Sequence, residues 1–320
     1  MMLSNSLGLQ AKAKKSIYIK NWDDLSFLNA LDSEPVLILG AGTNVILGEY
    51  FDGTVIEVHI QDIKSTNDHV SVGAGLDWSD LIEHCLKNQL YGLENLTHIP
   101  GKVGAAPVQN IGAYGVEISS FIHSIECFNL QTKQLEILQN NQCLFSYRQS
   151  IFQSKNYIIL RVNFSFSESF EPNLSYPALN NFLCNKSINK SALTPRLLSD
   201  LIKEIRNSKL PDPALVPNVG SVFKNPIVNL DNLDHDFLID HRWDQGNGYY
   251  KLSAAKLIEL IKSELTIPKT LNFYENHSLV LINNGGATFN EVTGFLNQIQ
   301  TKILEKFKIK LEIEPEIIPS

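Results

Sequence analysis

One stretch of this sequence, residues 99–117, limits what the chain can fold into more than any other. It reads IPGKVGAAPVQNIGAYGVE, with four glycines among small residues, two prolines and the pair Gln109-Asn110. It has neither helical nor strand periodicity, and an ordinary tight turn would need only one or two such residues. Glycine and alanine let a backbone approach a ligand closely, and amides supply hydrogen bonds. The stretch therefore predicts a loop shaped for a large, flat, anionic ligand.

Composition and charge narrow the class of protein. At 320 residues the chain is long enough for two or three domains. A hydrophobic fraction of 43% and a charged fraction of 19% are typical of a globular protein with real cores. The net charge of −7 argues against nucleic acid or an anionic membrane as the main partner.

The cysteines and the N-terminal residues predict a cytoplasmic protein. Cys85, Cys127, Cys143 and Cys184 lie far apart without C-x-x-C spacing, so we expect buried reduced thiols, no disulfide framework and no metal site. Residues 1–20 lack the apolar core of a signal peptide, and no stretch approaches the length of a membrane span.

A second glycine-containing turn follows the apolar run at residues 36–39. Gly40 and Gly42 resemble the start of a dinucleotide fingerprint, but the next run, Val45-Ile-Leu47, is typical of a strand and not of a helix N-terminus. The Rossmann interpretation therefore fails. A strand–turn–strand can still present backbone amides and Asn44 to a phosphate.

Apolar periodicity elsewhere predicts a mixed α+β protein with a boundary near Leu210-Pro-Asp-Pro213. Asp77 and Thr194 are the expected caps of two amphipathic helices, and residues 174–189 are polar, with Tyr176-Pro177 in a turn. The remaining expected elements are strands at 54–60, 70–72, 125–130, 134–138, 157–166, 278–283 and 311–318, and helices at about 253–265 and 290–308.

Taken in order, the loops resemble the UDP-N-acetylenolpyruvoylglucosamine reductases, in the subtype with a tyrosine loop. The shared motifs are NSLG from Asn5, LILGAGTNVIL, IPGKVGAAPVQNIGAYGVE, SYRQSIF, KLPDP, GSVFKNP, LVLIN and EPE, which together span nearly the whole chain.

The resemblance implies an α+β fold with three parts. The first is a two-part FAD-binding unit of the vanillyl-alcohol-oxidase (PCMH) type over residues 1–208, divided near residue 62 into 1–62 and 63–208. A smaller α/β substrate-binding domain over 209–310 follows, and a C-terminal strand over 311–320 returns to the active site.

The resemblance also implies the reaction. NADPH passes a hydride to FAD, and the reduced flavin delivers it to C3 of UDP-N-acetyl-3-O-(1-carboxyvinyl)-glucosamine, which gives UDP-N-acetylmuramate for peptidoglycan synthesis. The implied partners are NADPH and the UDP-sugar, without nucleic acid or membrane, and we expect a cytoplasmic monomer.

Three residues match the family's catalytic groups. Ser221 in GSVFKNP matches the proton donor to C2, although a turn serine is the ordinary alternative. Arg148 in SYRQSIF matches the arginine that pairs with the substrate carboxylate, and its alternative is a surface ion pair. Glu316, with Glu314 as its alternative, matches the second glutamate of the terminal EPE and would help stabilise the enolate.

The resemblance assigns binding roles to two further sets. The FAD-binding residues are Gly40, Gly42, Thr43, Asn44, Pro100, Gly101, Gly104, Gln109, Asn110, Gly112 and Ala113. The substrate-binding residues are Tyr176, which matches the stacking tyrosine, and Lys209, Lys224, Asn225 and His277.

The chain departs from the family pattern at several positions. Gln149 stands where the family has Asp, Pro217 replaces a Gly, and His277 takes a place often held by glutamine. The segment 269–274 replaces a glycine-rich turn. None of these changes removes a catalytic group, so they concern the geometry of the substrate loops.

Two rival interpretations stay open. Another flavin oxidase on the same fold is disfavoured because no histidine motif for covalent flavin attachment is found. A nucleotide-binding protein that has lost activity is the second.

Overall fold

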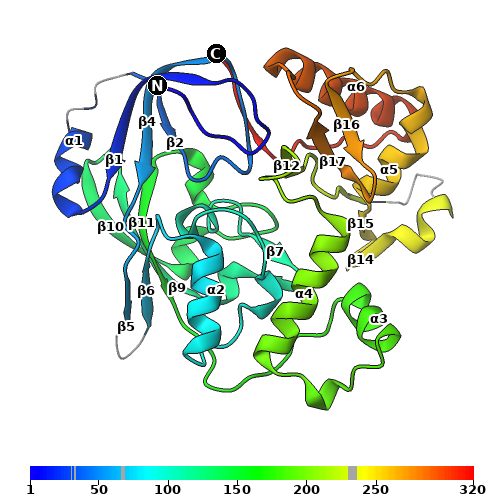
Figure 1. Ribbon diagram of the computed structural model, residues 1–320, viewed down its shortest axis with the longest axis horizontal. Helices are drawn as coiled ribbons and strands as arrows, with labels where there is room; N and C mark the ends of the chain where they lie inside the picture. The colour runs from blue at the N-terminus through cyan, green and yellow to red at the C-terminus, as the bar shows by residue number, and fades with distance from the viewer. Residues whose placement is uncertain (30, 32–33, 66–68, 230–235) are drawn as a thin grey trace. The chain divides into compact units, whose positions relative to one another are not determined.

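The computed structural model describes residues 1–29, 31, 34–65, 69–229 and 236–320. The chain forms two compact units, and each contains helices and strands (Figure 1). The first unit comprises residues 1, 13–41 and 52–207, and the second comprises residues 2–12, 42–51 and 208–320. This content agrees with the predicted α+β class.

Two sheets form the framework of the first unit. A five-stranded sheet has the order β10-β9-β11-β6-β5, and its neighbouring strands are antiparallel. A three-stranded sheet has the order β1-β4-β2, in which β2 and β4 are parallel. The bounds are β1 Lys12–Ile19, β2 Val36–Ile38, β4 Tyr50–Val58, β5 Ile63–Ser65, β6 Val70–Gly73, β9 Ile122–Asn129, β10 Gln134–Gln139 and β11 Tyr157–Phe164.

The five-stranded sheet buries both of its faces, and β11 contains a bulge that changes which residues point to each face. Leu160 packs in the same cluster as the three-stranded sheet, whereas Val162 and Phe164 pack in the cluster that contains the helix α2. The register shift between Ile159 and Arg161 interrupts the alternation that would otherwise place Leu160 and Val162 on one face. The sheet is therefore the middle layer of this unit.

The helices of the first unit are α1 (Ser26–Asn29), α2 (Trp78–Lys87), α3 (Pro177–Asn185) and α4 (Pro195–Lys209). Helix α2 buries the apolar stripe that its sequence predicts. Asp77 occupies its N-cap position, but no cap hydrogen bond forms there. Instead, the Asp77 carboxylate lies 2.9 Å from Nζ of Lys102.

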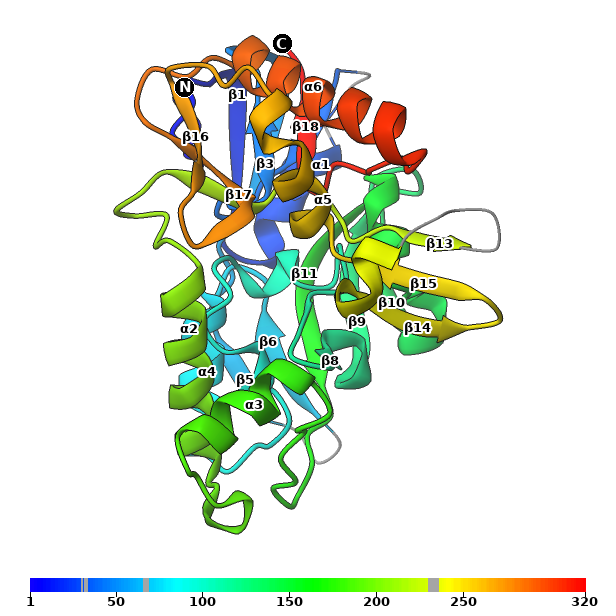
Figure 2. The ribbon, with the colours of Figure 1, turned by 90° about the vertical axis from the view of Figure 1, so that its right-hand side faces the viewer.

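Helix α3 corrects an expectation from the sequence, which predicted only a turn in this polar segment. Pro177 stands at its first helical position, where the missing N–H costs nothing. Leu179 of α3 packs with Leu198 and Ile202 of α4, and the two helices lie together in Figure 2. Thr194 caps α4 as predicted, because its Oγ1 accepts the Leu197 N–H at 3.2 Å.

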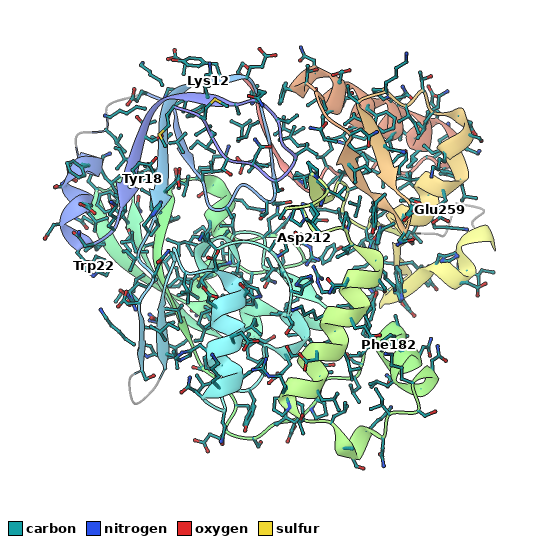
Figure 3. All side chains as sticks on the ribbon, in the orientation of Figure 1. Lys12, Tyr18, Trp22, Phe182, Asp212 and Glu259 are labelled. Carbon is teal, nitrogen blue, oxygen red and sulfur yellow. The ribbon has the colours of Figure 1, made fainter. Side chains whose placement is uncertain are left out.

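The second unit is built on a sheet covered by helices. Its strand order is β12-β17-β16, with bounds Asn218–Ser221, His277–Asn283 and Leu271–Tyr274. Helices α5 (Ala254–Ile261) and α6 (Phe289–Phe307) pack with this sheet in one core (Figure 1). Figure 3 labels Glu259 on α5, and Asp212 in the segment that leads into β12.

Smaller pairings complete the second unit. A three-stranded sheet has the order β13-β15-β14, with bounds Ile227–Asn229, Tyr249–Leu252 and Arg242–Gly246. Strand β18 (Glu316–Ile318) pairs in parallel with β3 (Val45–Leu47). The strand predicted over 311–318 is therefore shorter, and Ile313 makes only an isolated bridge to Phe223.

Helix α6 follows the predicted stripe except at one position. Val292, Phe295, Leu296, Ile299, Ile303 and Phe307 are buried, but Leu304 is 48% exposed. Thr288 and Glu291 form a capping box at its start. No helix within the described ranges, α6 included, is long and apolar enough to cross a membrane.

The two leucines of α6 provide a matched test of this packing. Leu296 is fully buried, so Leu296→Ala should lower the free energy of unfolding by about 2–5 kcal/mol. Leu304→Ala on the same helix should change it by less than about 0.5 kcal/mol. Urea denaturation measures both values, and equal losses would contradict the assigned helix orientation.

Candidate active site

The glycine-rich loop packs directly on the five-stranded sheet. The Val103 N–H donates to the Leu76 carbonyl at 2.9 Å, and the Gly104 N–H donates to the Ala74 carbonyl at 2.8 Å. A Cβ added at Gly104 would lie 2.6 Å from Cβ of Ala74. Close packing on Ala74, the residue after β6, therefore requires glycine at this position, whatever else the loop binds.

The end of the loop is a short hairpin formed by β7 (Gly112–Ala113) and β8 (Val116–Glu117). Tyr114 and Gly115 make the turn, with φ of 49° and 83°. Both residues are in the left-handed region, which suits glycine and costs tyrosine some strain.

The turn after β2 brings Gly40, one of the predicted cofactor residues, to the loop. A Cβ at Gly40 would lie 3.5 Å from Cβ of Ala105 and 3.8 Å from Cγ of Lys102. Gly42 is buried in the second unit, where a Cβ would lie 2.4 Å from the Ser4 carbonyl oxygen. Thr43 and Asn44 follow it, and the next element is the strand β3, which agrees with rejection of a Rossmann helix.

The loop exposes backbone at small residues above a buried base. Gly101, Gly112 and Ala113 are half-buried, whereas Val103 and Asn110 beneath them are buried. A ligand can therefore contact backbone at small residues that stand on a fixed base. Pro100 and Gln109 lie in the same loop and stay predicted contacts.

Asn110 organises the loop from inside. It is fully buried, and its Nδ2 donates to a Glu117 carboxylate oxygen at 2.8 Å and to the Ser146 carbonyl at 3.1 Å. Its Oδ1 accepts the Ser119 N–H at 3.1 Å. The side chain predicted to contact the cofactor is thus used within the protein, which leaves its backbone as the candidate contact.

Arg148 is held at the edge of this loop. Its Nη2 donates to the Gly112 carbonyl at 3.0 Å, and a Cβ at Gly112 would lie 3.2 Å from Nη1. Arg148 has φ of 54° in a turn closed by reciprocal backbone hydrogen bonds between Ser146 and Gln149, each 3.1 Å. Glycine at 112 therefore leaves room for the guanidinium.

Gln149, the departure from the family's Asp, keeps a structural contact. Its side-chain carbonyl oxygen accepts a hydrogen bond from the Ser146 hydroxyl at 3.2 Å. The residue therefore closes the same turn through both its backbone and its side chain.

Tyr176 lies against the tip of the glycine-rich hairpin. Its ring makes an edge contact with Tyr114, with ring centroids 5.5 Å apart. Burial raises the pKa of both phenols, so both remain neutral at physiological pH. A Cβ at Gly115 would lie 2.5 Å from the Ser175 Oγ, so the tyrosine loop and the hairpin pack closely.

Arg206 is a site candidate that the sequence analysis missed. It lies on α4, and its Nε donates to the His98 carbonyl at 3.1 Å. Burial lowers the pKa of Arg206, and the neighbouring Tyr114 partly offsets this effect. The sequence could have indicated Arg206, because it lies three residues before Lys209 and therefore on the same face of the predicted helix.

Ser221 ends the strand β12 in an irregular backbone. Gly220 has φ of 73°, and the pairing with β17 shifts register between Asn218 and Ser221. The Gly220 N–H donates to Oδ1 of Asn218 at 2.9 Å. This irregularity leaves Ser221 half-buried between the buried Val219 and Val222.

Within the second unit, Glu316 belongs to a segment that hydrogen bonds beside Ser221. The Glu314 N–H donates to the Val222 carbonyl, and the Glu316 N–H donates to the Asn44 carbonyl, each at 3.0 Å. The structure thus gathers the chain around Ser221, Glu316 and Asn44. Arg148 belongs to the first unit.

The predicted substrate residues of the second unit have identifiable neighbours. Burial lowers the pKa of His277, and the charge of Lys209 lowers it further, so the imidazole is neutral at pH 7. Lys224 pairs with Glu312 at 3.2 Å. Oδ1 of Asn225 accepts the Ala254 N–H at 3.0 Å, at the start of α5.

Three of the four cysteines are unsuited to nucleophilic chemistry. Cys85, Cys127 and Cys143 are buried, and burial raises their pKa to about 12. Cys184 on α3 is exposed, which corrects the expectation that all four are buried. In the part of the chain that the structure describes, no three His, Cys, Asp or Glu side chains form a metal site.

Comparison with protein families gives two matches. The FAD binding domain model covers residues 25–137. The model of the UDP-N-acetylenolpyruvoylglucosamine reductase C-terminal domain covers residues 212–318.

Curated relatives match the chain along nearly its full length. The UDP-N-acetylenolpyruvoylglucosamine reductase of Neisseria gonorrhoeae is 37% identical over 331 residues, with 99% of this chain and 95% of the relative covered. The protein of that name from Amoebophilus asiaticus is 36% identical, with 98% and 96% covered.

A solved structure supports the fold. The crystal structure of UDP-N-acetylenolpyruvylglucosamine reductase (MurB) from Thermus caldophilus matches with a TM-score of 0.68 and 21% identity, and 98% and 96% of the two chains are covered. Together with the FAD binding domain match, this confirms the predicted α+β fold with a flavin-binding unit of the vanillyl-alcohol-oxidase type.

The Asn110 network predicts a specific electrostatic defect. Asn110→Asp would set a second carboxylate against Glu117 and the Ser146 carbonyl, and should lower the free energy of unfolding by about 3 kcal/mol. Adding Glu117→Gln, which supplies an amide donor, should restore much of this loss in urea denaturation. An unchanged midpoint for Asn110→Asp, or no rescue, would contradict the network.

Proposed function

The chain belongs to the UDP-N-acetylenolpyruvoylglucosamine reductase family of FAD-dependent oxidoreductases, and we propose that it uses NADPH to reduce UDP-N-acetyl-3-O-(1-carboxyvinyl)-glucosamine to UDP-N-acetylmuramate. The observation that carries the proposal is the grouping of Ser221 and Glu316 in one unit, joined through the Glu314–Val222 hydrogen bond. A cytoplasmic location and a monomeric state are part of the same proposal.

The reaction requires the protein to stabilise negative charge that develops on the substrate. FAD, when bound, supplies the carrier that takes a hydride from NADPH and delivers it to C3 of the enolpyruvyl group. Charge then develops on C2 and on the substrate carboxylate. The protein's own groups must stabilise this charge and return a proton to C2.

Ser221 is the proposed proton donor to C2. A serine hydroxyl is a weak acid in water, but the C2 enolate is a strong base, so a positioned hydroxyl can transfer its proton. The irregular backbone at Gly220 and the half-buried position of Ser221 support this role. Both features favour a hydroxyl in a fixed place with limited access for water.

Arg148 and Glu316 are the proposed stabilisers of the enolate. A planar guanidinium matches a carboxylate that gains negative charge, and the hydrogen bond from Arg148 to the Gly112 carbonyl limits where that guanidinium can lie. Glu316 is fixed through its backbone to Asn44. We propose that its carboxyl group orients or polarises the enolic carboxyl group of the substrate.

The binding residues fall into two proposed sets. The residues that would hold the UDP-sugar are Lys209, Lys224, Asn225, a neutral His277 and Tyr176. Arg206 is added to them because it donates to the His98 carbonyl, just before the glycine-rich loop. The FAD set comprises Gly40, Gly42, Thr43, Asn44, Pro100, Gly101, Gly104, Gln109, Asn110, Gly112 and Ala113.

One assay separates the proposal from its rivals. NADPH oxidation by the flavin-loaded protein is followed with and without the enolpyruvyl-UDP-sugar, and sugar-dependent oxidation is expected. Oxidation of NADPH by oxygen that the sugar does not stimulate would favour another flavin oxidase. A purified protein without flavin absorbance that binds only nucleotide would favour a non-catalytic protein.

Ser221→Ala should affect only the second half of the reaction. The variant keeps flavin reduction by NADPH, but reoxidation by the sugar should slow by about 10²–10⁴-fold or more because the positioned acid is lost. Stopped-flow absorbance measures each half-reaction separately. Ser263→Ala, at an exposed serine of the same unit, is the control, and unchanged reoxidation in Ser221→Ala would remove the assigned role.

Arg148→Lys should turn over poorly although charge is conserved, because an ammonium cannot make the two parallel contacts of a guanidinium. We expect a loss of about 10²-fold or more in kcat/KM for the sugar. Arg196→Lys is the control, since Arg196 makes a fork contact with Glu83 at 2.6 and 2.9 Å on the surface. Near-normal turnover of Arg148→Lys would exclude it from the site.

A further inference from the structure

A buried asparagine just before the glycine-rich loop joins two parts of the first unit. Asn95 is 2% exposed. Its Nδ2 donates to the Tyr114 carbonyl and to the Asn173 carbonyl, each at 2.9 Å. One amide group therefore connects the tip of the glycine-rich hairpin with the start of the segment that leads to Tyr176.

Three further contacts join the same two segments. Nδ2 of Asn173 donates to the Gly115 carbonyl at 3.4 Å. Gly115 has room only for hydrogen beside Ser175, and the Tyr114 and Tyr176 rings meet edge to face. The segment 173–176 is therefore fixed on the hairpin by contacts with Tyr114 and Gly115.

The residues on either side of Asn95 are themselves anchored. A Glu94 carboxylate oxygen accepts the Gly92 N–H at 2.9 Å, and the Leu96 carbonyl accepts the Trp78 indole N–H at 2.9 Å. The hydroxyls of Thr97 and Ser199 lie 2.8 Å apart in the interior. Asn95 thus donates from a rigid base, which a positioning side chain requires.

We propose that Asn95 is a positioning residue that sets Tyr176 against the glycine-rich hairpin and thereby tunes capture of the nucleotide-sugar. The inference rests on the proposed function, since Tyr176 is a proposed substrate contact there. Asn95 acts only through the backbone of the two segments. Its NH₂ group, with two donors on one nitrogen, satisfies both carbonyls at once.

Asn95→Leu, which keeps the volume but removes both donors, tests the proposal in the flavin-loaded protein. KM for the enolpyruvyl-UDP-sugar should rise on the order of 10-fold, as expected for the loss of two hydrogen bonds. The flavin content, the rate of flavin reduction by NADPH and kcat at saturating sugar should stay within about 2-fold. Loss of flavin together with sugar affinity would overturn the proposal.

Asn140→Leu is the matched control. Nδ2 of Asn140 also bridges two backbone carbonyls, those of Ser119 and Ile122, each at 2.8 Å, on the β9–β10 side of the same unit. It should lower stability without raising KM for the sugar. An equal rise in KM for both variants would mean that general destabilisation, and not the position of Tyr176, explains the effect.

A double-mutant cycle tests whether Asn95 acts through Tyr176. In a Tyr176→Ala background, Asn95→Leu should raise KM by less than about 2-fold further, because the side chain that it positions is absent. Effects that simply multiply would show that Asn95 acts by another route and would overturn the proposal.

Amide hydrogen exchange measures the connection without any turnover. In Asn95→Leu, residues 173–179 should exchange on the order of 10-fold faster than in the unsubstituted protein, and Asn140→Leu should not share this change. If the unsubstituted protein fails to oxidise NADPH with the sugar, the proposed function falls, while the exchange result still decides the positioning role. Unchanged exchange would refute that role.

A second variant keeps the test open if Asn95→Leu does not fold. Asn173 is exposed. Asn173→Ala removes its hydrogen bond to the Gly115 carbonyl and the two that its Oδ1 accepts from Ser175, with little cost to the core. It should raise both KM for the sugar and exchange at residues 173–179 in the same direction but by less. No change in either measurement would contradict the proposal.

Discussion

The first unit depends on the close approach of the glycine-rich loop to Ala74, the residue that follows β6. This approach requires glycine at position 104, because a Cβ there would lie 2.6 Å from Cβ of Ala74. Backbone hydrogen bonds to Ala74 and Leu76 then fix the loop. Because the loop packs against a sheet that is buried on both faces, its backbone is held in place and can position neighbouring groups. Arg148 is placed by the Gly112 carbonyl and the tyrosine loop by Tyr114 and Gly115.

The extent to which the fold could be predicted depended on how strongly each segment was periodic. Helix α6 and the hairpin of β9 and β10 have clear patterns and lie where the sequence placed them. Helix α3 was missed because its segment is polar and begins with Tyr176-Pro177, a pair that is also typical of turns. The last strand was predicted too long, because the apolar alternation from Leu311 continues through residues that make only an isolated bridge.

The site shows a similar division. Residue types with recognisable chemistry, such as Arg148, Ser221 and Glu316, could be proposed as site residues from motifs. Asn95 and the internal role of Asn110 could not. Asn95 donates to backbone carbonyls 19 and 78 residues away in the chain, and Asn110 donates to one 36 residues away. A carbonyl carries no residue identity, so such a contact leaves no pattern in the sequence. Only the folded chain reveals it.

At Arg148, which has a left-handed backbone with φ of 54°, the residue that the turn prefers differs from the one that the proposed chemistry requires. By conformation alone, glycine or asparagine would suit this turn better than arginine. The arginine therefore carries a strain on the order of 1 kcal/mol. Selection for thermal stability alone would therefore favour replacement of Arg148 by glycine or asparagine. The free energy of unfolding would rise, but the guanidinium proposed to stabilise the enolate would be lost.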